Sequence, residues 1–163
     1  MGYNMSEVWI CFLGVTPQAI YNTIWAAVSK NMCKPVKFHF IASKEAIKHR
    51  STIEKKVKAI CQEFLNITPE IKFHIVDEQD LEEIFKAPRE IARQEKEKGN
   101  NAVIDVTPGR KYMSIASLLA ALDCNAEKIL YLHLKDPSYQ GKDYPLIPYP
   151  LQELRDLKNE FRR

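Results

Sequence analysis

The feature that most constrains the fold of this chain is a short apolar run, residues 8–13, that ends at Gly14 and leads directly into a helical pattern. An uninterrupted apolar run of this length is typical of a strand buried on both faces of a parallel sheet. Thr16 stands where a helix is capped, and Pro17 suits the first helical position. The next apolar residues recur at helical spacing through Val28. This segment is therefore predicted to be a strand-to-helix turn.

The alternation of strands and helices continues along the chain. We expect further strands at residues 36–41, 71–76, 102–106 and 129–134. Ser43 is expected to cap the second helix, acidic residues from Asp80 onward to begin the third, and Pro88 to break that third helix in two. Such alternation predicts an α/β fold of Rossmann-like, doubly wound type. Its mainly parallel sheet would have five or six strands in the order 3-2-1-4-5, with helices on both faces.

A chain of 163 residues fits one domain, so residues 1–163 are expected to form a single domain with its core at about 6–135. The segment 136–150 holds four of the nine prolines and is expected to be an extended arm. The spacing of Leu151, Leu154, Leu157 and Phe161 predicts a closing helix, so the arm and this helix together would occupy residues 136–163.

Composition narrows the possible partners and compartments. The surplus of three positive charges is too small for a protein that wraps duplex DNA, and it leaves room for a modest anionic ligand. The four cysteines form no C-x-x-C pair and the four histidines are scattered. We therefore expect the reducing cytoplasm, no metal and no cofactor. No apolar run approaches a membrane span, and the myristoylation-like pattern of residues 1–6 is interpreted as a chance match.

Two loops carry the residues suited to chemistry, and the predicted strand order makes them neighbours. The first offers backbone N–H groups, a hydroxyl and an amide, contributed by Gly14, Val15, Thr16 and Gln18. The second is compressed into residues 105–114 and contains Thr107, Pro108, Gly109, Arg110, Lys111 and Met113. Two cations at a helix N-terminus are unfavourable unless a negative group lies near, so a phosphate would relieve the repulsion.

Simpler interpretations of these loops stay open at this point. Thr16 could serve only as a helix cap. Arg110 and Lys111 could extend into solvent, or one of them could pair with Asp105. The helix at residues 112–122 is apolar nearly all the way round. Either a homodimer interface or enclosure within one chain would cover it.

No G-x-G-x-x-G or P-loop motif is present, which argues against a conventional dehydrogenase or ATPase. The pairing of residues 13–18 with residues 105–114 instead resembles the CRISPR-associated Rossmann fold (CARF) family, and the proline-rich segment 144–150 resembles the family's usual ending. Pro108 departs from the pattern, since a second glycine is common there. The resemblance implies a homodimer that binds cyclic tetra- or hexa-adenylate, a second messenger of type III CRISPR antiviral defence.

The resemblance also implies two alternative activities. In a stand-alone ring nuclease, a ribose 2′-hydroxyl would attack the adjacent phosphorus without metal, with Lys111 stabilising the developing charge and Thr16 orienting the reacting groups. Arg110 and Thr107 would help to hold the phosphate backbone, and Gln18 and Ser43 would contact the adenine or ribose. In the alternative, the domain is a non-catalytic sensor whose effector or DNA-binding module is separate or truncated. A weaker third hypothesis is a regulator that recruits DNA or an effector subunit.

Overall fold

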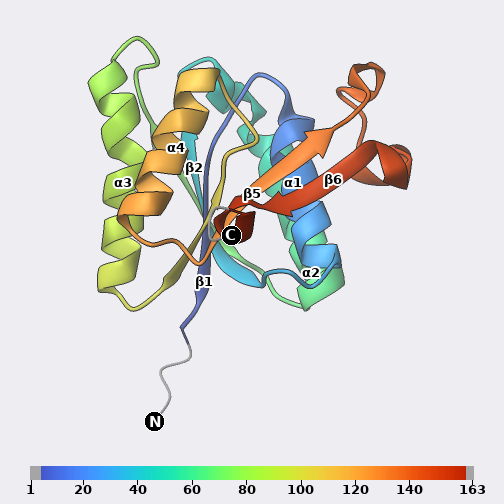
Figure 1. Ribbon diagram of the computed structural model, residues 1–163, viewed down its shortest axis with the longest axis horizontal. Coiled ribbons are helices and arrows are strands. Elements are labelled where there is room, and N and C mark those ends of the chain that lie inside the picture. Colours follow the sequence, from blue (N-terminus) through green and yellow to red (C-terminus); the bar gives the residue numbers. More distant parts are fainter. Residues whose placement is uncertain (1–4, 161–163) are drawn as a thin grey trace.

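A computed structural model describes residues 5–160 of the chain. Their centre is a six-stranded sheet in the order β3-β2-β1-β4-β5-β6 (Figure 1). Strands β1 to β5 run parallel, and β6 is antiparallel to β5. The predicted doubly wound α/β class and the order 3-2-1-4-5 are therefore confirmed. The strands are β1 (Glu7–Phe12), β2 (Pro35–Ala42), β3 (Glu70–Ile75), β4 (Asn101–Asp105), β5 (Lys128–Leu134) and β6 (Gln152–Asp156).

Helices cover both faces of this sheet. α1 (Pro17–Ser29) and α2 (Arg50–Leu65) pack together on one face, and α3 (Leu81–Glu97) and α4 (Lys111–Asp123) pack together on the other (Figure 1). The crossovers from β1 and β4 thus leave in opposite directions, which opens a crevice at the carboxyl ends of these strands. The shorter helices are η1 (Ala46–His49), η2 (Pro137–Tyr139), η3 (Tyr144–Leu146), η4 (Tyr149–Leu151) and α5 (Leu157–Glu160).

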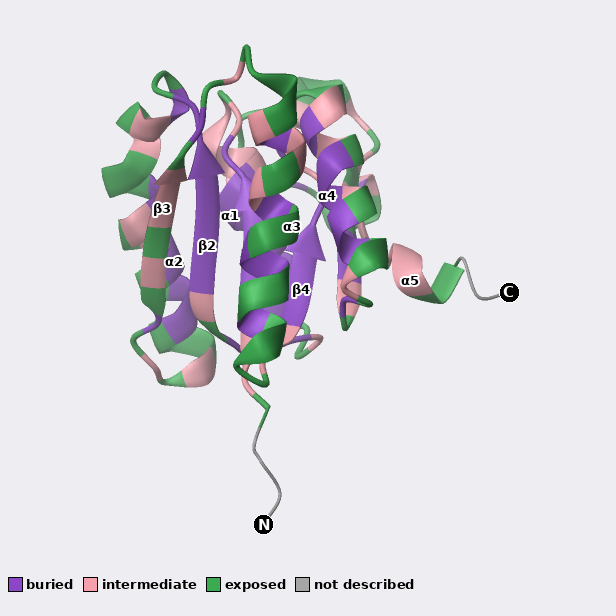
Figure 2. Ribbon diagram, turned by 90° about the vertical axis from the view of Figure 1, so that its left-hand side faces the viewer, coloured by how far each residue is buried: buried purple, intermediate pink, exposed green. Residues whose placement is uncertain are grey.

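The core lies in two layers, one on each face of the sheet. Trp9 and Cys11 of β1 belong to the layer under α1 and α2, whereas Ile10 and Phe12 belong to the layer under α3 and α4. Figure 2 shows the central strands as the most fully buried part of the molecule. This double burial explains why the sequence of β1 is continuously apolar rather than alternating.

The expectation that Pro88 divides the third helix is wrong. α3 runs unbroken from Leu81 to Glu97 with Pro88 buried inside it. A proline inside a helix removes one hydrogen bond and costs about 3 kcal/mol. Ile84 and Ile91, one turn before and one turn after Pro88, are both buried against the sheet. Burial of such side chains contributes about 1.5–3 kcal/mol each, so packing offsets the cost of the proline.

The predicted closing helix is also wrong over most of its length. Residues 152–156 form β6, which pairs with β5, and of the described residues after β6 the four of α5 are helical. Leu154 and Leu157 pack against different core layers rather than along one helical stripe. The unpaired edge of β5 offers backbone hydrogen bonds that a separate helix would leave unmade. Phe161 and residues 1–4 of the myristoylation-like pattern lie outside the described residues.

Residues 5–160 contain neither a membrane-spanning helix nor a metal-binding cluster. None of the helices described there is both long and apolar enough to cross a bilayer. No group of three or more His, Cys, Asp or Glu side chains in this part of the chain has the geometry to hold a metal ion. His39 is instead buried in a polar cluster, where it contacts His74 at 2.8 Å and Glu95 at 3.1 Å.

Candidate functional site

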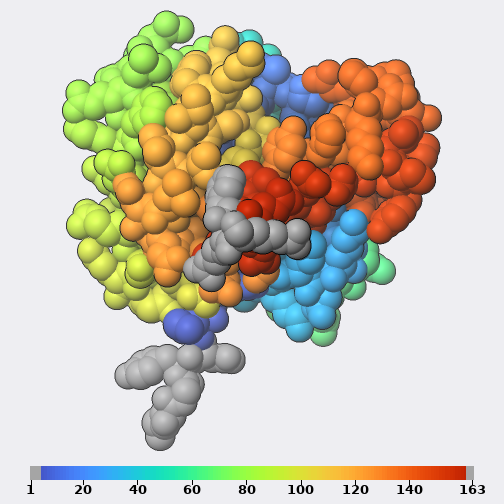
Figure 3. Space-filling model, viewed as in Figure 1, coloured from blue at the N-terminus to red at the C-terminus, as the bar shows by residue number. Residues whose placement is uncertain are grey.

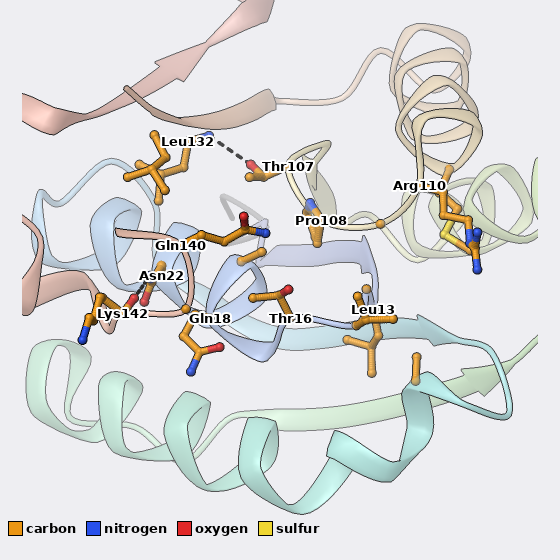
Figure 4. A pocket seen from close by; sticks show the side chains of 18 of the residues that line it. Leu13, Thr16, Gln18, Asn22, Thr107, Pro108, Arg110, Leu132, Gln140 and Lys142 are labelled. Atoms are coloured by element: carbon orange, nitrogen blue, oxygen red, sulfur yellow. Dashed lines mark hydrogen bonds between the residues drawn. The ribbon is translucent and has the colours of Figure 1, made fainter. Parts of the chain in front are cut away.

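A cavity of about 640 Å³ opens beyond the carboxyl ends of β1 and β4 (Figure 4). Its volume is that of a site for a small ligand. Figure 3 shows α4 and the segment before β6 on either side of the start of α1, where this cavity lies. All the predicted site residues except Lys111 line the cavity: Gly14, Val15, Thr16, Gln18, Ser43, Thr107, Pro108, Gly109, Arg110 and Met113.

The two predicted loops touch each other at their glycines. A Cβ atom on Gly14 would lie 3.0 Å from the backbone nitrogen of Gly109. Gly109 itself has a φ of +95°, and a Cβ there would lie 3.0 Å from the sulfur of Met113. A side chain at Gly14 would push the loops apart, whereas one at Gly109 would crowd Met113 and strain the backbone. The sequence places glycine where the backbones must approach most closely.

Asp105, the last residue of β4, fixes the position of the second loop. It is buried at the end of β4, and its Oδ1 accepts a hydrogen bond of 2.9 Å from the Thr107 amide. The other carboxylate oxygen, Oδ2, has no hydrogen-bond partner among residues 5–160. Burial raises the pKa of Asp105 to about 7, although the hydrogen bonds from Thr107 act in the opposite direction. No ion pair of Asp105 is formed within residues 5–160, and Arg110 pairs with Glu78 instead, so the expectation that a neighbouring cation pairs with Asp105 is wrong.

Hydroxyl groups in the cavity differ in how far they are already engaged. The Thr107 Oγ1 accepts a hydrogen bond of 2.9 Å from the Leu132 amide (Figure 4), so this hydroxyl is already engaged within the chain. Ser43 Oγ accepts from the Ala46 amide at 3.1 Å. The expectation that Ser43 caps the second helix is wrong, because α2 begins at Arg50 with His49 at its N-cap. Thr16 occupies the N-cap of α1 but makes no capping hydrogen bond. The hydroxyl of Thr16 is thus available to a ligand, contrary to the simpler interpretation.

The cations of the second loop occupy different surroundings. Arg110 is paired with the Glu78 carboxylate at 3.5 Å, and the Tyr112 hydroxyl donates to the Glu78 carbonyl at 3.2 Å. Lys111 begins α4, is exposed, and is absent from the cavity lining. No ion pair of Lys111 occurs within residues 5–160. Of the two cations in this loop, only Arg110 lines the cavity of one chain, and a carboxylate already holds it.

One wall of the cavity was not predicted from the sequence. We use the name "arm" for residues 136–151, which join β5 to β6 and place Tyr139, Gln140 and Lys142 against the cavity. Asn22 of α1 also lines it. The prolines predicted an extended arm at residues 136–150, whereas the segment contains the short turns η2, η3 and η4. Nothing in the local sequence specifies that it folds back over α1. That information lies in contacts between residues more than a hundred positions apart.

The outer face of α4 carries an apolar stripe. Ile115, Leu119 and Leu122 are 53%, 42% and 55% exposed, and their spacing places them on one side of the helix. No described segment of this chain covers them, so enclosure of the whole helix within one chain is wrong. A cover from outside the chain is the alternative that the sequence left open.

The sequence matches no family model and no curated protein. Solved structures do match. Csm6 from Enterococcus italicus, bound to cyclic hexa-2′-fluoro-hexa-dAMP, aligns with 98% of this chain at a TM-score of 0.65 and 13% identity. Can2 from Sulfobacillus thermosulfidooxidans, in complex with cyclic tetra-adenylate, aligns with 82% at a TM-score of 0.56 and 17% identity. Protein VC1899 from Vibrio cholerae aligns with 82% at a TM-score of 0.59 and 12% identity.

These alignments span 44%, 33% and 32% of the respective solved chains, so the present chain corresponds to less than half of each. The sheet order, the helices on both faces and the cavity at the strand ends are consistent with the resemblance seen in the two loops. At these identities the likeness concerns the fold. The chain therefore contains a domain with the CARF-like fold.

Proposed function

We propose that this protein binds a cyclic oligoadenylate, such as cyclic tetra- or hexa-adenylate, at the carboxyl ends of β1 and β4. The observation that carries the proposal is the contact between Gly14 and Gly109, which joins two loops at helix N-termini beside one cavity. Backbone N–H groups at such positions favour phosphate. Two structural neighbours of this chain were solved with cyclic adenine nucleotides, which supports the ligand class.

The ligand would be shared by a homodimer. A ring of phosphodiesters has repeated negative charges, and a twofold pair of loops can meet them symmetrically. The exposed stripe of Ile115, Leu119 and Leu122 on α4 supplies an apolar surface for the second copy. α4 begins at the cavity, so a dimer formed along it would bring the two cavities near one axis.

Replacing Leu119 with glutamate is expected to weaken self-association by about tenfold or more, because two unpaired carboxylates would be buried across the axis. Sedimentation velocity over a range of concentrations measures the change. The matched control is Phe64→Glu, a similar change at a side chain that is 44% exposed on α2. A Leu119→Glu protein that associates like the wild type would show that α4 is not the interface.

We further propose that the bound ring is opened without a metal. The 2′-oxygen of one ribose would attack the adjacent phosphorus, the bond to the 5′-oxygen would break, and a 2′,3′-cyclic phosphate would result, with the proton passing to the departing oxygen. Thr16 would orient the reacting groups, because its hydroxyl faces the cavity and caps no helix. Lys111 would stabilise the added charge. The alternative is a sensor that retains the ring intact.

One pair of measurements tests these proposals. Calorimetry with cyclic tetra- and hexa-adenylate at moderate salt should detect binding, and its failure with both rings would overturn the proposed function. Incubation of the same rings with the protein in EDTA should give linear products. Rings that are bound but recovered intact would replace the nuclease with the non-catalytic sensor.

Glu78 is expected to compete with the ligand for Arg110, since the two side chains lie 3.5 Å apart. A partly exposed ion pair contributes up to about 1 kcal/mol, so Glu78→Gln should tighten cyclic adenylate binding by up to about fivefold. Calorimetry compares this variant with Glu82→Gln, which removes an exposed carboxylate of α3 that pairs with Lys86 outside the cavity. Equal affinity in the two variants would show that Arg110 does not contact the ligand.

A further inference from the structure

The arm is held firmly against α1 by side chains buried between them. Asn22 is 5% exposed and bonds to the backbone of the arm twice, donating to the Lys142 carbonyl at 2.8 Å and accepting from the Tyr144 amide at 2.9 Å. Asp143 accepts from the Tyr21 hydroxyl at 2.6 Å and from Lys56 at 2.8 Å. The residues just before Lys142 therefore have a fixed position relative to the first loop.

Gln140 stands on this fixed segment and extends into the cavity. Figure 4 shows its side chain directed toward Thr16 and Pro108. The backbone amide of Gln140 bonds to the Pro137 carbonyl at 3.0 Å, which completes the η2 turn. No hydrogen bond of the Gln140 side-chain amide is formed within residues 5–160, so its donor and its acceptor are both free for a ligand.

A side-chain amide is chemically matched to one base edge. Its oxygen accepts from the adenine 6-amino group while its nitrogen donates to adenine N7, a bidentate pairing that hypoxanthine and guanine cannot form because they carry a carbonyl at position 6. Leu132 and Tyr139 line the same cavity and offer the apolar surface that a base needs on its face. The surroundings of Gln140 thus suit a base more than a phosphate.

We propose that Gln140, presented by the arm, reads the adenine edge and makes the cavity selective for adenine over other purines. This inference rests on the proposed function, because it assigns the base specificity of the same site. In the sequence, the arm is separate from both loops that would hold the phosphates. Base selection and phosphate binding therefore reside in different segments of the chain.

The test measures binding of two rings of equal size and charge, cyclic tetra-adenylate and cyclic tetra-inosinate. Both are used in 2′-fluoro form, which lacks the hydroxyl that ring opening needs. Wild-type protein is expected to prefer the adenine ring by about 10- to 100-fold. Gln140→Leu keeps the side-chain size and removes the amide, so it should reduce the preference to less than about threefold by weakening the adenine ring alone. The control Gln62→Leu changes an exposed amide on α2 and should retain the full preference.

Each alternative result has a distinct meaning. If Gln140→Leu discriminates as strongly as wild type, Gln140 does not read the base, while the binding function stands. If wild-type protein binds both rings equally, the inference of adenine selection is overturned and the binding function again stands. If wild-type protein binds neither of these rings nor the corresponding pair of hexanucleotide rings, the proposed function fails and the inference fails with it.

Discussion

Replacement of Asp105 with asparagine is expected to raise the free energy of unfolding, relative to that of the wild type, by about 3 kcal/mol between pH 5 and pH 8. The physical cause is the buried carboxyl group, whose pKa is raised from 3.8 to about 7 in the folded chain. Between those values the folded state holds a proton that the unfolded state has lost. The carboxyl group therefore contributes less stability as the pH rises toward 7, and asparagine removes this dependence.

Urea unfolding of both proteins at pH 5, 6, 7 and 8 measures the effect. The difference between the two proteins is the informative quantity, because other groups contribute equally to both. His39, for example, has its pKa lowered to about 4 by burial, so its contribution is lost as the pH falls and opposes that of Asp105. The free energy of unfolding of the variant, relative to that of the wild type, should rise steadily up to pH 7 and then remain constant. Parallel profiles would mean that Asp105 is ionised throughout in the folded protein.

Replacement of Lys111 with alanine is expected to slow ring opening by about 100- to 1000-fold with little change in ring affinity, because a positioned charge acts mainly on the transition state. Lys111 lies outside the cavity of a single chain. In the proposed dimer the ring extends beyond either cavity and can pass over the start of α4. Single-turnover cleavage of cyclic tetra-adenylate in EDTA gives the rate.

The matched control is Lys55→Ala, which removes an exposed cation of α2 outside the cavity and should leave the rate unchanged. Thr16→Ala provides a second comparison, since Thr16 already faces the cavity in one chain. Loss of cleavage in Thr16→Ala together with a normal rate in Lys111→Ala would assign the chemistry to the cavity alone. A normal rate in both variants would remove both residues from the mechanism.

The strand order and the joined loops were predictable because each depends on local patterns. Continuous apolar runs mark the buried strands, and Gly14 and Gly109 stand in the loops that follow two of them. β6 was not predictable in this way, because Leu154 and the flanking Leu151 and Leu157 match helical spacing. Only the free edge of β5 decides between strand and helix. The partner of Arg110 was missed for a similar reason. Glu78 follows a different strand, and folding alone brings it within reach.

The same reason explains why the arm escaped prediction. Its position depends on Asn22 and Tyr21, which the sequence marks only as ordinary members of α1. Polar side chains that bond to distant backbone groups leave no periodic signal. The identity of the elements was thus encoded locally, whereas the far wall of the cavity was encoded by individual long-range hydrogen bonds.

The contact between Gly14 and Gly109 limits how such a cavity can diversify. A side chain added at Gly14 meets the backbone of Gly109, and one added at Gly109 meets Met113 and Phe12, so neither glycine can be replaced without moving its neighbours. The connection between β5 and β6 lies at the surface and can gain or lose residues without disturbing the sheet. Relatives that accommodate larger or smaller ligands are therefore expected to differ in the length of this connection while keeping the contact between the two glycines.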